Sequence, residues 1–263
     1  MMNETATIEL HDLSTGYRLR SNNIVVAEGL RATLQRGQLT CLLGPNGCGK
    51  STLLRTMGGF QPALAGRIDV CGRPLADYTA QEQARLVSVV LTDNSNIREM
   101  TAWDVVAMGR SPYTNFWGRL TDADRQEVDR CIELVGLRHL AQRRIHTLSD
   151  GERQKVMIAK AIAQGTDIIL LDEPTAFLDY PNKVGMLLLL HRIAHELGRS
   201  IFLSTHDMEH ALQVADQIWL LDRTLGLTTG SPADLSHNGS VARYFQTDAM
   251  TFDAETRSFR IKA

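Results

Sequence analysis

A glycine-rich turn that follows a buried strand constrains the fold of this chain more than any other feature. The apolar stretch 39–43 leads into the turn, and we expect a helix to begin at Lys50. Glycines let the backbone curl until successive N–H groups point at one anion, and the helix N-terminus adds partial positive charge. The complete spacing predicts a nucleoside triphosphate site rather than a tight turn with an exposed lysine. The turn comprises Gly44, Pro45, Asn46, Gly47, Cys48, Gly49, Lys50, Ser51 and Thr52.

Two carboxylates at the end of a second buried strand extend this chemistry. The run 168–171 is continuously apolar and is followed by Asp172 and Glu173. Continuous apolar residues are typical of a strand buried on both faces, so both acids are expected at the ligand edge of the sheet. Lys50 would meet the β- and γ-phosphates, while Ser51 and Asp172 would hold Mg²⁺. Glu173 would orient and deprotonate the attacking water, although the two acids alone would suggest only a solvated strand end.

The composition excludes several other classes of protein. The chain has 263 residues with a net charge of −2, and its basic residues form no stripe of the kind that binds nucleic acid. The longest apolar run, 185–190, is too short to span a bilayer, and the start of the chain lacks the pattern of a signal peptide. Four scattered cysteines without C-x-x-C spacing predict no metal centre or disulfide framework. We therefore expect a cytoplasmic location.

The periodicity of the sequence predicts an α/β fold with a helical insertion. Strand-like segments come first, helical segments dominate from about 101 to 165, and strands then alternate with helices. Such alternation indicates a parallel sheet with its ligand edge at the carboxyl ends of the strands. We expect a domain over 1–245 with an antiparallel opening section and a helical subdomain, followed by a tail, 246–263, that forms a β-hairpin. The predicted elements are 7–10, 24–27, 67–71, 101–109, 122–135, 150–163, 168–172, 180–197, 200–204, 207–215 and 217–222.

Histidines allow two kinds of interpretation. His206 follows the strand 200–204, where it can reach a γ-phosphate or simply cap the next helix. His206 with His210, and His191 with His195, have the four-residue spacing of helical metal pairs. Neither pair carries the H-E-x-x-H arrangement, so we expect both to lie on solvated helix faces.

The segment 148–154 opens the helix that precedes the Asp172 strand. Ser149 is a good N-cap residue, and Glu152 three positions later completes a capping box. With this segment in place, the chain resembles the nucleotide-binding subunit of an ATP-binding cassette (ABC) transporter over nearly its whole length. Five motifs occur in the family's order. They are the Walker A loop at 44–52, the signature at 148–152, the Walker B strand at 168–173, the D-loop at 176–179 and the switch histidine His206.

The resemblance implies ATP and Mg²⁺ as ligands and a head-to-tail dimer of two copies. Each ATP would lie between the Walker A loop of one copy and the signature of the other. Tyr17 matches the aromatic residue on which the adenine stacks, although it also suits an ordinary turn. In trans, Ser149, Gly151 and Glu152 would contact the partner's nucleotide, and Asp179 would order the opposing site.

Two positions depart from the family pattern. Asp150 stands where the signature has glycine, and its carboxylate would have to point away from a triphosphate. Thr92 stands where the Q-loop has glutamine. The threonine hydroxyl can still ligate Mg²⁺ weakly or through water, but its shorter side chain puts Q-loop sensing of the membrane partner in doubt.

Further residues suggest which branch of the family this is. The segment 104–113 and the run 116–118 are similar to importers of siderophores, haem and cobalamin. The resemblance implies a separate permease, a periplasmic or lipoprotein solute-binding protein, and a location at the cytoplasmic face of the inner membrane. Tyr113, Phe116 and Trp117 either dock the permease's coupling helix or pack within the subdomain. The alternative function is a soluble ABC ATPase, as in iron–sulfur cluster assembly; a small-molecule kinase would lack Ser149 and His206.

Overall fold

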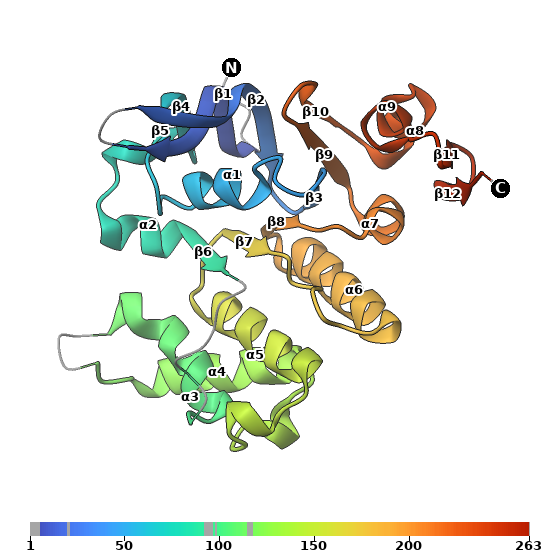
Figure 1. Cartoon of the computed structure of the whole chain (residues 1–263). Coiled ribbons are helices and arrows are strands. Elements are labelled where there is room, and N and C mark those ends of the chain that lie inside the picture. Colours follow the sequence, from blue (N-terminus) through green and yellow to red (C-terminus); the bar gives the residue numbers. More distant parts are fainter. Residues whose placement is uncertain (1–5, 20–21, 92–96, 98, 115–117, 263) are drawn as a thin grey trace.

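The computed structural model describes residues 6–19, 22–91, 97, 99–114 and 118–262. Two larger sheets and a group of helices make up most of this part of the chain (Figure 1). The strands are β1 (Ala6–Arg18), β2 (Asn23–Gln35), β3 (Leu39–Leu43), β4 (Ala65–Val70), β5 (Arg73–Pro74), β6 (Val87–Val90), β7 (Ile168–Asp172), β8 (Ser200–Ser204), β9 (Gln217–Asp222), β10 (Gly226–Gly230), β11 (Met250–Asp253) and β12 (Ser258–Ile261). The α-helices are α1 (Lys50–Met57), α2 (Ala80–Leu86), α3 (Ala102–Ala107), α4 (Asp122–Leu134), α5 (Asp150–Ala163), α6 (Tyr180–Leu197), α7 (Met208–Val214), α8 (Pro232–His237) and α9 (Ser240–Phe245).

The six-stranded sheet has the order β10-β9-β3-β8-β7-β6, and all its neighbouring pairs are parallel except β10 with β9. Every residue of β3, β7 and β8 is buried, which explains why these strands read as unbroken apolar runs. Because β3, β8 and β7 are direct neighbours, the segments that follow them meet at one edge. The phosphate loop, the two acids and His206 all lie in these segments.

The two faces of this sheet carry separate cores. Leu42 and Leu170 belong to a core shared with α1 and the antiparallel sheet. Cys41 and Leu171, one position along each strand, belong to the core shared with the helices α3 to α7. Alternate residues of a strand point to opposite faces, so α1 and α5 lie on opposite sides of the sheet (Figure 1). The predicted α/β fold with a β subdomain and an inserted helical subdomain is confirmed.

The antiparallel sheet has the order β2-β1-β4-β5. Our predictions of 7–10 and 24–27 were too short, because β1 and β2 each extend over 13 residues. Several register shifts interrupt their pairing, and these bulges break the regular alternation that marks a strand in the sequence. The prediction of 67–71 ended one residue late, since Cys71 adopts a positive φ in the turn after β4.

The helical group is built on capped helices that pack closely. Capping boxes begin α3 at Thr101, α4 at Thr121 and α5 at Ser149. We predicted one helix over 101–109, whereas α3 ends at Ala107 and a 3-10 turn, Met108–Tyr113, follows. Gly109 allows this turn to approach α5, because a Cβ there would lie 2.3 Å from the Lys160 carbonyl oxygen. No helix among the described residues has both the length and the apolar character that a membrane span requires.

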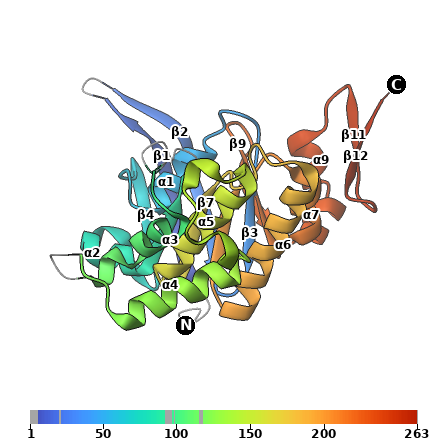
Figure 2. The same cartoon turned by 90° about the horizontal axis from the view of Figure 1, so that it is seen from below.

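The C-terminal part contains three elements, β10, α8 and α9, that the periodicity did not reveal. Strand β10 and helices α8 and α9 follow β9, and α8 begins at a Ser231 cap with Pro232 in its first turn. Strands β11 and β12 then pair as an antiparallel hairpin. The hairpin lies beside α9 at the end of the molecule opposite α2 (Figures 1 and 2).

Candidate functional site

The phosphate loop connects β3 to α1 in a shape that needs glycine at two points. A Cβ on Gly44 would lie 2.2 Å from the Leu221 carbonyl oxygen. Gly49, the N-cap of α1, has a φ of 110°, and a Cβ there would lie 2.6 Å from Val26 Cγ1. Because neither position has room for a side chain, the loop is fixed as a narrow cradle in front of the N-terminus of α1.

Lys50 is folded into this cradle. Its Nζ donates hydrogen bonds to the carbonyl oxygens of Gly44, at 2.8 Å, and Pro45, at 3.1 Å. The residue is only 5% exposed, and burial lowers the pKa of its ammonium group. The charge is thus positioned inside the loop, where phosphate oxygens would be stronger partners for it than the two neutral carbonyl groups.

A group of oxygen atoms lies beside the loop at the ends of β7 and β8. The Ser51 hydroxyl donates to Asp172 Oδ1 at 3.0 Å, and the Ser204 hydroxyl donates to the same oxygen at 2.7 Å. Asp172 is buried, so these contacts hold its carboxylate in one orientation. A hydroxyl and a carboxylate side by side are the hard oxygen ligands that suit Mg²⁺, and the residues present therefore fit that ion.

Glu173 and His206 face each other next to this group. His206 Nε2 lies 2.5 Å from Glu173 Oε1. The Glu173 backbone has a φ of 49°, and its N–H donates to Ser204 Oγ at 3.0 Å. The serine thus supports both acids, and the sequence motifs gave no signal of this role for Ser204. The arrangement places a carboxylate and an imidazole together at the ligand edge of the sheet.

A cavity of about 460 Å³ adjoins Glu173 and His206. Its wall includes Thr175 and Thr205 from the core and Met250 and Phe259 from the C-terminal hairpin. The hairpin is held there because the Phe259 N–H donates to Glu209 Oε1 at 2.9 Å. Sequence reasoning left the tail without a role, since nothing in 246–263 resembles a nucleotide motif.

Tyr17, which the sequence analysis matched to the adenine-stacking residue, lies beside the phosphate loop. Its hydroxyl lies 3.2 Å from Thr52 Oγ1, and its side chain is 46% exposed. The hydroxyl contact anchors the ring next to the start of α1, and the exposed surface leaves the ring accessible to a stacking partner.

The signature segment is on the other side of the sheet from the phosphate loop, because Leu148 belongs to the core on the α5 face and Cys48 to the core on the α1 face. Ser149 accepts a hydrogen bond from the Glu152 N–H at 3.3 Å, and Glu152 Oε2 accepts from the Ser149 hydroxyl at 2.9 Å. Asp150 forms an ion pair with Arg153, so its carboxylate turns back along α5. Gly151 is next to Asn182 of α6, with 3.4 Å between its ideal Cβ position and Asn182 Cγ. Within one copy, the signature and the phosphate loop cannot therefore enclose the same nucleotide.

The segment 176–179 leads into α6 and exposes an aromatic side chain. Asp179 caps the helix by accepting a hydrogen bond from the Asn182 N–H at 3.0 Å. Leu178 is buried, whereas Phe177 is 87% exposed with a φ of 64°. This exposed phenylalanine was not singled out from the sequence.

Comparison with known proteins places these features in a family. A family model described as ABC transporter matches residues 27–176, which is more than half of the chain. This chain belongs to the ABC transporter family. Within that family it is a subunit that binds and hydrolyses ATP. The resemblance seen in the five motifs is confirmed.

Two relatives of this ABC subunit match it over more than four-fifths of their own length. An uncharacterised ABC transporter ATP-binding protein of Methanocaldococcus jannaschii is 36% identical, with 97% of this chain and 87% of that protein covered. The iron(3+)-hydroxamate import ATP-binding protein FhuC of Bacillus subtilis is 34% identical, with 92% and 89% covered. A solved ABC transporter provisionally assigned to the metal-chelate type, in an inward-facing conformation, has a TM-score of 0.78 at 28% identity, with 97% and 95% covered.

Three predicted residues of the ABC subunit lie outside the described part of the chain. These are Thr92, Phe116 and Trp117, so their predicted roles stay predictions. Tyr113 is described, and its ring lies 4.1 Å from the Arg110 guanidinium and 5.4 Å from that of Arg85. The ring is 39% exposed, so it packs within the helical subdomain and also presents a surface.

The two histidine pairs of the ABC subunit have different surroundings, and only His210 departs from the expected solvated helix face. His210 Nδ1 is 2.6 Å from Asp207 Oδ1 and is mostly buried, while His206 faces Glu173, so the two do not converge. His191 and His195 do converge, on Asp216. Both remain partly exposed on the helix surface, and the shared carboxylate partner is a feature that the sequence did not indicate.

Proposed function

We propose that this ABC subunit hydrolyses ATP to power import of a metal chelate of the iron–siderophore, haem or cobalamin class. The observation that carries the proposal is the similarity, over more than nine-tenths of this chain, to subunits named for such import. FhuC of Bacillus subtilis is named for iron(3+)-hydroxamate and is 34% identical over 92% of this chain. FepC of Escherichia coli is named for ferric enterobactin and is 31% identical over 96% of this chain.

The phosphates of ATP would bind in the loop 44–52. Lys50 would leave the carbonyl oxygens of Gly44 and Pro45 and neutralise charge on the β- and γ-phosphates. Ser51 and Asp172 would hold Mg²⁺, with Thr92 as a further oxygen ligand. When bound, the ion would neutralise charge that develops on the phosphate oxygens.

Glu173 and His206 would act on the γ-phosphate side. In the described geometry these two side chains pair with each other. We infer that the pair separates when ATP binds, so that Glu173 accepts a proton from the attacking water and His206 donates a hydrogen bond to the γ-phosphate. Tyr17 would stack on the adenine ring.

The second half of each ATP site would come from a second copy. The signature is on the opposite side of the sheet from the phosphate loop, so a head-to-tail pair would bring one copy's Ser149 and Gly151 to the other copy's γ-phosphate. Glu152 would hold Ser149 in place, and Asp179 would order the opposing site. The N-terminus of α5 would then direct its partial positive charge toward the triphosphate.

The import function requires partners that the chain itself does not supply. A separate permease would hold two copies at the cytoplasmic face of the inner membrane, and a solute-binding protein would deliver the chelate. The exposed surface of Tyr113 would contribute to the contact with the permease. The alternative function, a soluble ATPase for iron–sulfur cluster assembly, receives no support from the relatives described above.

Reconstitution tests the proposal directly. The chain is co-purified with a permease of the same organism and placed in liposomes. ATP is supplied inside, and the binding protein and a ferric siderophore are supplied outside. We expect ATP-dependent uptake of iron, and no uptake when Lys50→Ala replaces the natural chain. ATP hydrolysis by a chain that forms no complex with any permease would contradict the import function and favour the soluble machine.

Asp150 provides a test of the signature. Asp150→Gly restores the usual family residue and should change steady-state turnover by less than about fivefold. The reason is that the substitution removes only an exposed ion pair with Arg153, and such a pair contributes roughly 0.2–1 kcal/mol. Arg153→Ala is the matched control, since it removes the same pair but keeps the carboxylate. If Asp150→Gly raised turnover more than about tenfold, the carboxylate would oppose the triphosphate instead of turning toward Arg153.

A further inference from the structure

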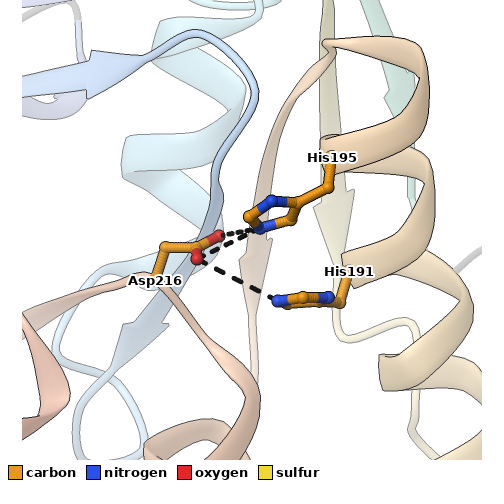
Figure 3. A group of neighbouring side chains, drawn as sticks. All are labelled: His191, His195 and Asp216. Atoms are coloured by element: carbon orange, nitrogen blue, oxygen red, sulfur yellow. Dashed lines mark hydrogen bonds and ion pairs between the residues drawn. The ribbon is translucent and has the colours of Figure 1, made fainter.

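Three side chains that could bind a metal converge far from the nucleotide site. His191 and His195 lie one turn apart on α6, and Asp216 lies immediately before β9 (Figure 3). His195 Nε2 is 3.1 and 3.0 Å from the two Asp216 carboxylate oxygens, and His191 Nε2 is 4.0 Å from Oδ1. One ligand atom from each residue lies within 4.8 Å of the others. Figure 3 shows both Nε2 atoms directed at the same carboxylate.

The carboxylate is fixed by the sheet rather than by the histidines alone. The Leu39 N–H donates to Asp216 Oδ2 at 2.8 Å, and the Asp216 N–H donates to the Leu39 carbonyl oxygen at 2.9 Å. These bonds hold Asp216 at the start of β3. On the other side, α6 is anchored by buried residues, among them Leu190 and Ile193 on either side of His191. Two rigid elements therefore position the three ligands, as a preorganised metal site requires.

The chemistry of these groups suits a borderline transition metal. Two imidazole nitrogens and a carboxylate oxygen bind Zn²⁺ at about 2.0–2.2 Å and leave a fourth position for water. The ligand atoms are close enough that small side-chain rotations would bring them to such distances. His195 has a side chain that is 46% exposed, so an ion can reach the site from solvent.

Among the described residues, Asp216 forms ion pairs with His191 and His195 and with no arginine or lysine. Arg192 donates to the Leu134 carbonyl oxygen, and Arg199 and Arg36 both pair with Asp167. The carboxylate charge thus remains available to a metal ion.

We propose that His191, His195 and Asp216 form a binding site for a divalent transition metal of the Zn²⁺ class. The site lies at the start of β3, whereas the phosphate loop follows its end, so a five-residue strand of roughly 16 Å separates them. It is therefore distinct from the magnesium ligands at Ser51 and Asp172. Bound metal would cross-link α6 to the segment between α7 and β9. Helix α6 begins next to Asp179, and α7, which precedes the cross-linked segment, begins two residues after His206.

Zinc titration of the full-length, tag-free and nucleotide-free protein tests this proposal. All proteins carry Cys71→Ser, because Cys71 is the exposed cysteine of the chain. By calorimetry we expect one Zn²⁺ per chain. Loss of a residue that only supports a metal ligand lowers metal affinity roughly 10- to 100-fold. The double variant His191→Ala/His195→Ala loses two ligands, so its zinc affinity should fall by more than that. The control double variant His139→Ala/His237→Ala removes two imidazoles elsewhere and should bind as the parent does.

Two further readouts separate ligation from misfolding. Co²⁺ bound by the parent should show the visible absorption of a four-coordinate site, and the His191→Ala/His195→Ala variant should lack it while keeping normal ATP binding. Asp216→Asn retains an oxygen acceptor for the Leu39 N–H and should weaken zinc binding with the fold intact. A parent protein without a stoichiometric zinc site, or unchanged zinc affinity in the His191→Ala/His195→Ala variant, would overturn the proposal.

Discussion

A Glu173→Gln variant should bind ATP as tightly as the natural protein and hydrolyse it at least about a hundred times more slowly, the usual scale for loss of a general base. The substitution keeps an oxygen that can accept from His206 Nε2, which lies 2.5 Å from Glu173 in the described structure. It also leaves unchanged the backbone contact of residue 173 with Ser204. The amide cannot take a proton from water, so the chemical step fails while the site keeps its shape. Phosphate release and fluorescent-nucleotide binding measure the two quantities separately.

Glu209→Gln is the matched control for this experiment. Glu209 lines the same cavity as Glu173, but its carboxylate accepts a hydrogen bond from the Phe259 N–H and supports the C-terminal hairpin. We expect its turnover to stay within a few-fold of the natural value, the scale of one exposed hydrogen bond. Normal turnover in Glu173→Gln, or an equal loss in both variants, would remove Glu173 from the role of general base.

The contrast between these two glutamates illustrates what the sequence can and cannot predict. Strands β7 and β8 matched their predicted bounds because both are buried on two faces and read as unbroken apolar runs. Their shared ligand edge followed from the rule for parallel strands, so the proximity of Glu173 and His206 could be expected. The wall contributed by Met250 and Phe259 could not, because it depends on how a distant hairpin docks.

Residues that act through tertiary contacts were the ones missed. Ser204 supports both Asp172 and Glu173, but a serine at the end of a strand has no distinctive pattern. The His191 and His195 spacing was noticed, yet the third ligand is 21 residues beyond His195 and is positioned by the start of β3. Helical spacing alone gives two ligands on one face, and only the fold reveals what lies opposite them.

The dimer provides the second large expected effect. Glu173→Gln, which retains ATP, should form a dimer with ATP and remain a monomer with ADP, as measured by light scattering after size exclusion. The reason is geometric: the signature and the phosphate loop lie on opposite sides of the sheet, so only a second copy can complete each site. The γ-phosphate would then bridge the two copies, and its loss in ADP would remove that contact.

Gly151→Asp in the Glu173→Gln background should abolish this dimer. Gly151 is buried but has no positive φ, and a Cβ there would lie at an ordinary 3.4 Å from Asn182, so we expect the backbone of the monomer to keep its conformation. A carboxylate in the first turn of α5 even favours the helix, but across the interface it would repel the partner's triphosphate. Gly185→Asp adds the same charge on α6, one turn after Asn182 and outside the signature, where nothing lies within 4 Å of the new Cβ, and should leave the dimer intact. If Gly151→Asp dimerised with ATP as readily as Gly185→Asp, the signature would not face the partner's nucleotide.

A Glu173→Gln protein that stayed monomeric with ATP even beside the permease would contradict the head-to-tail arrangement itself.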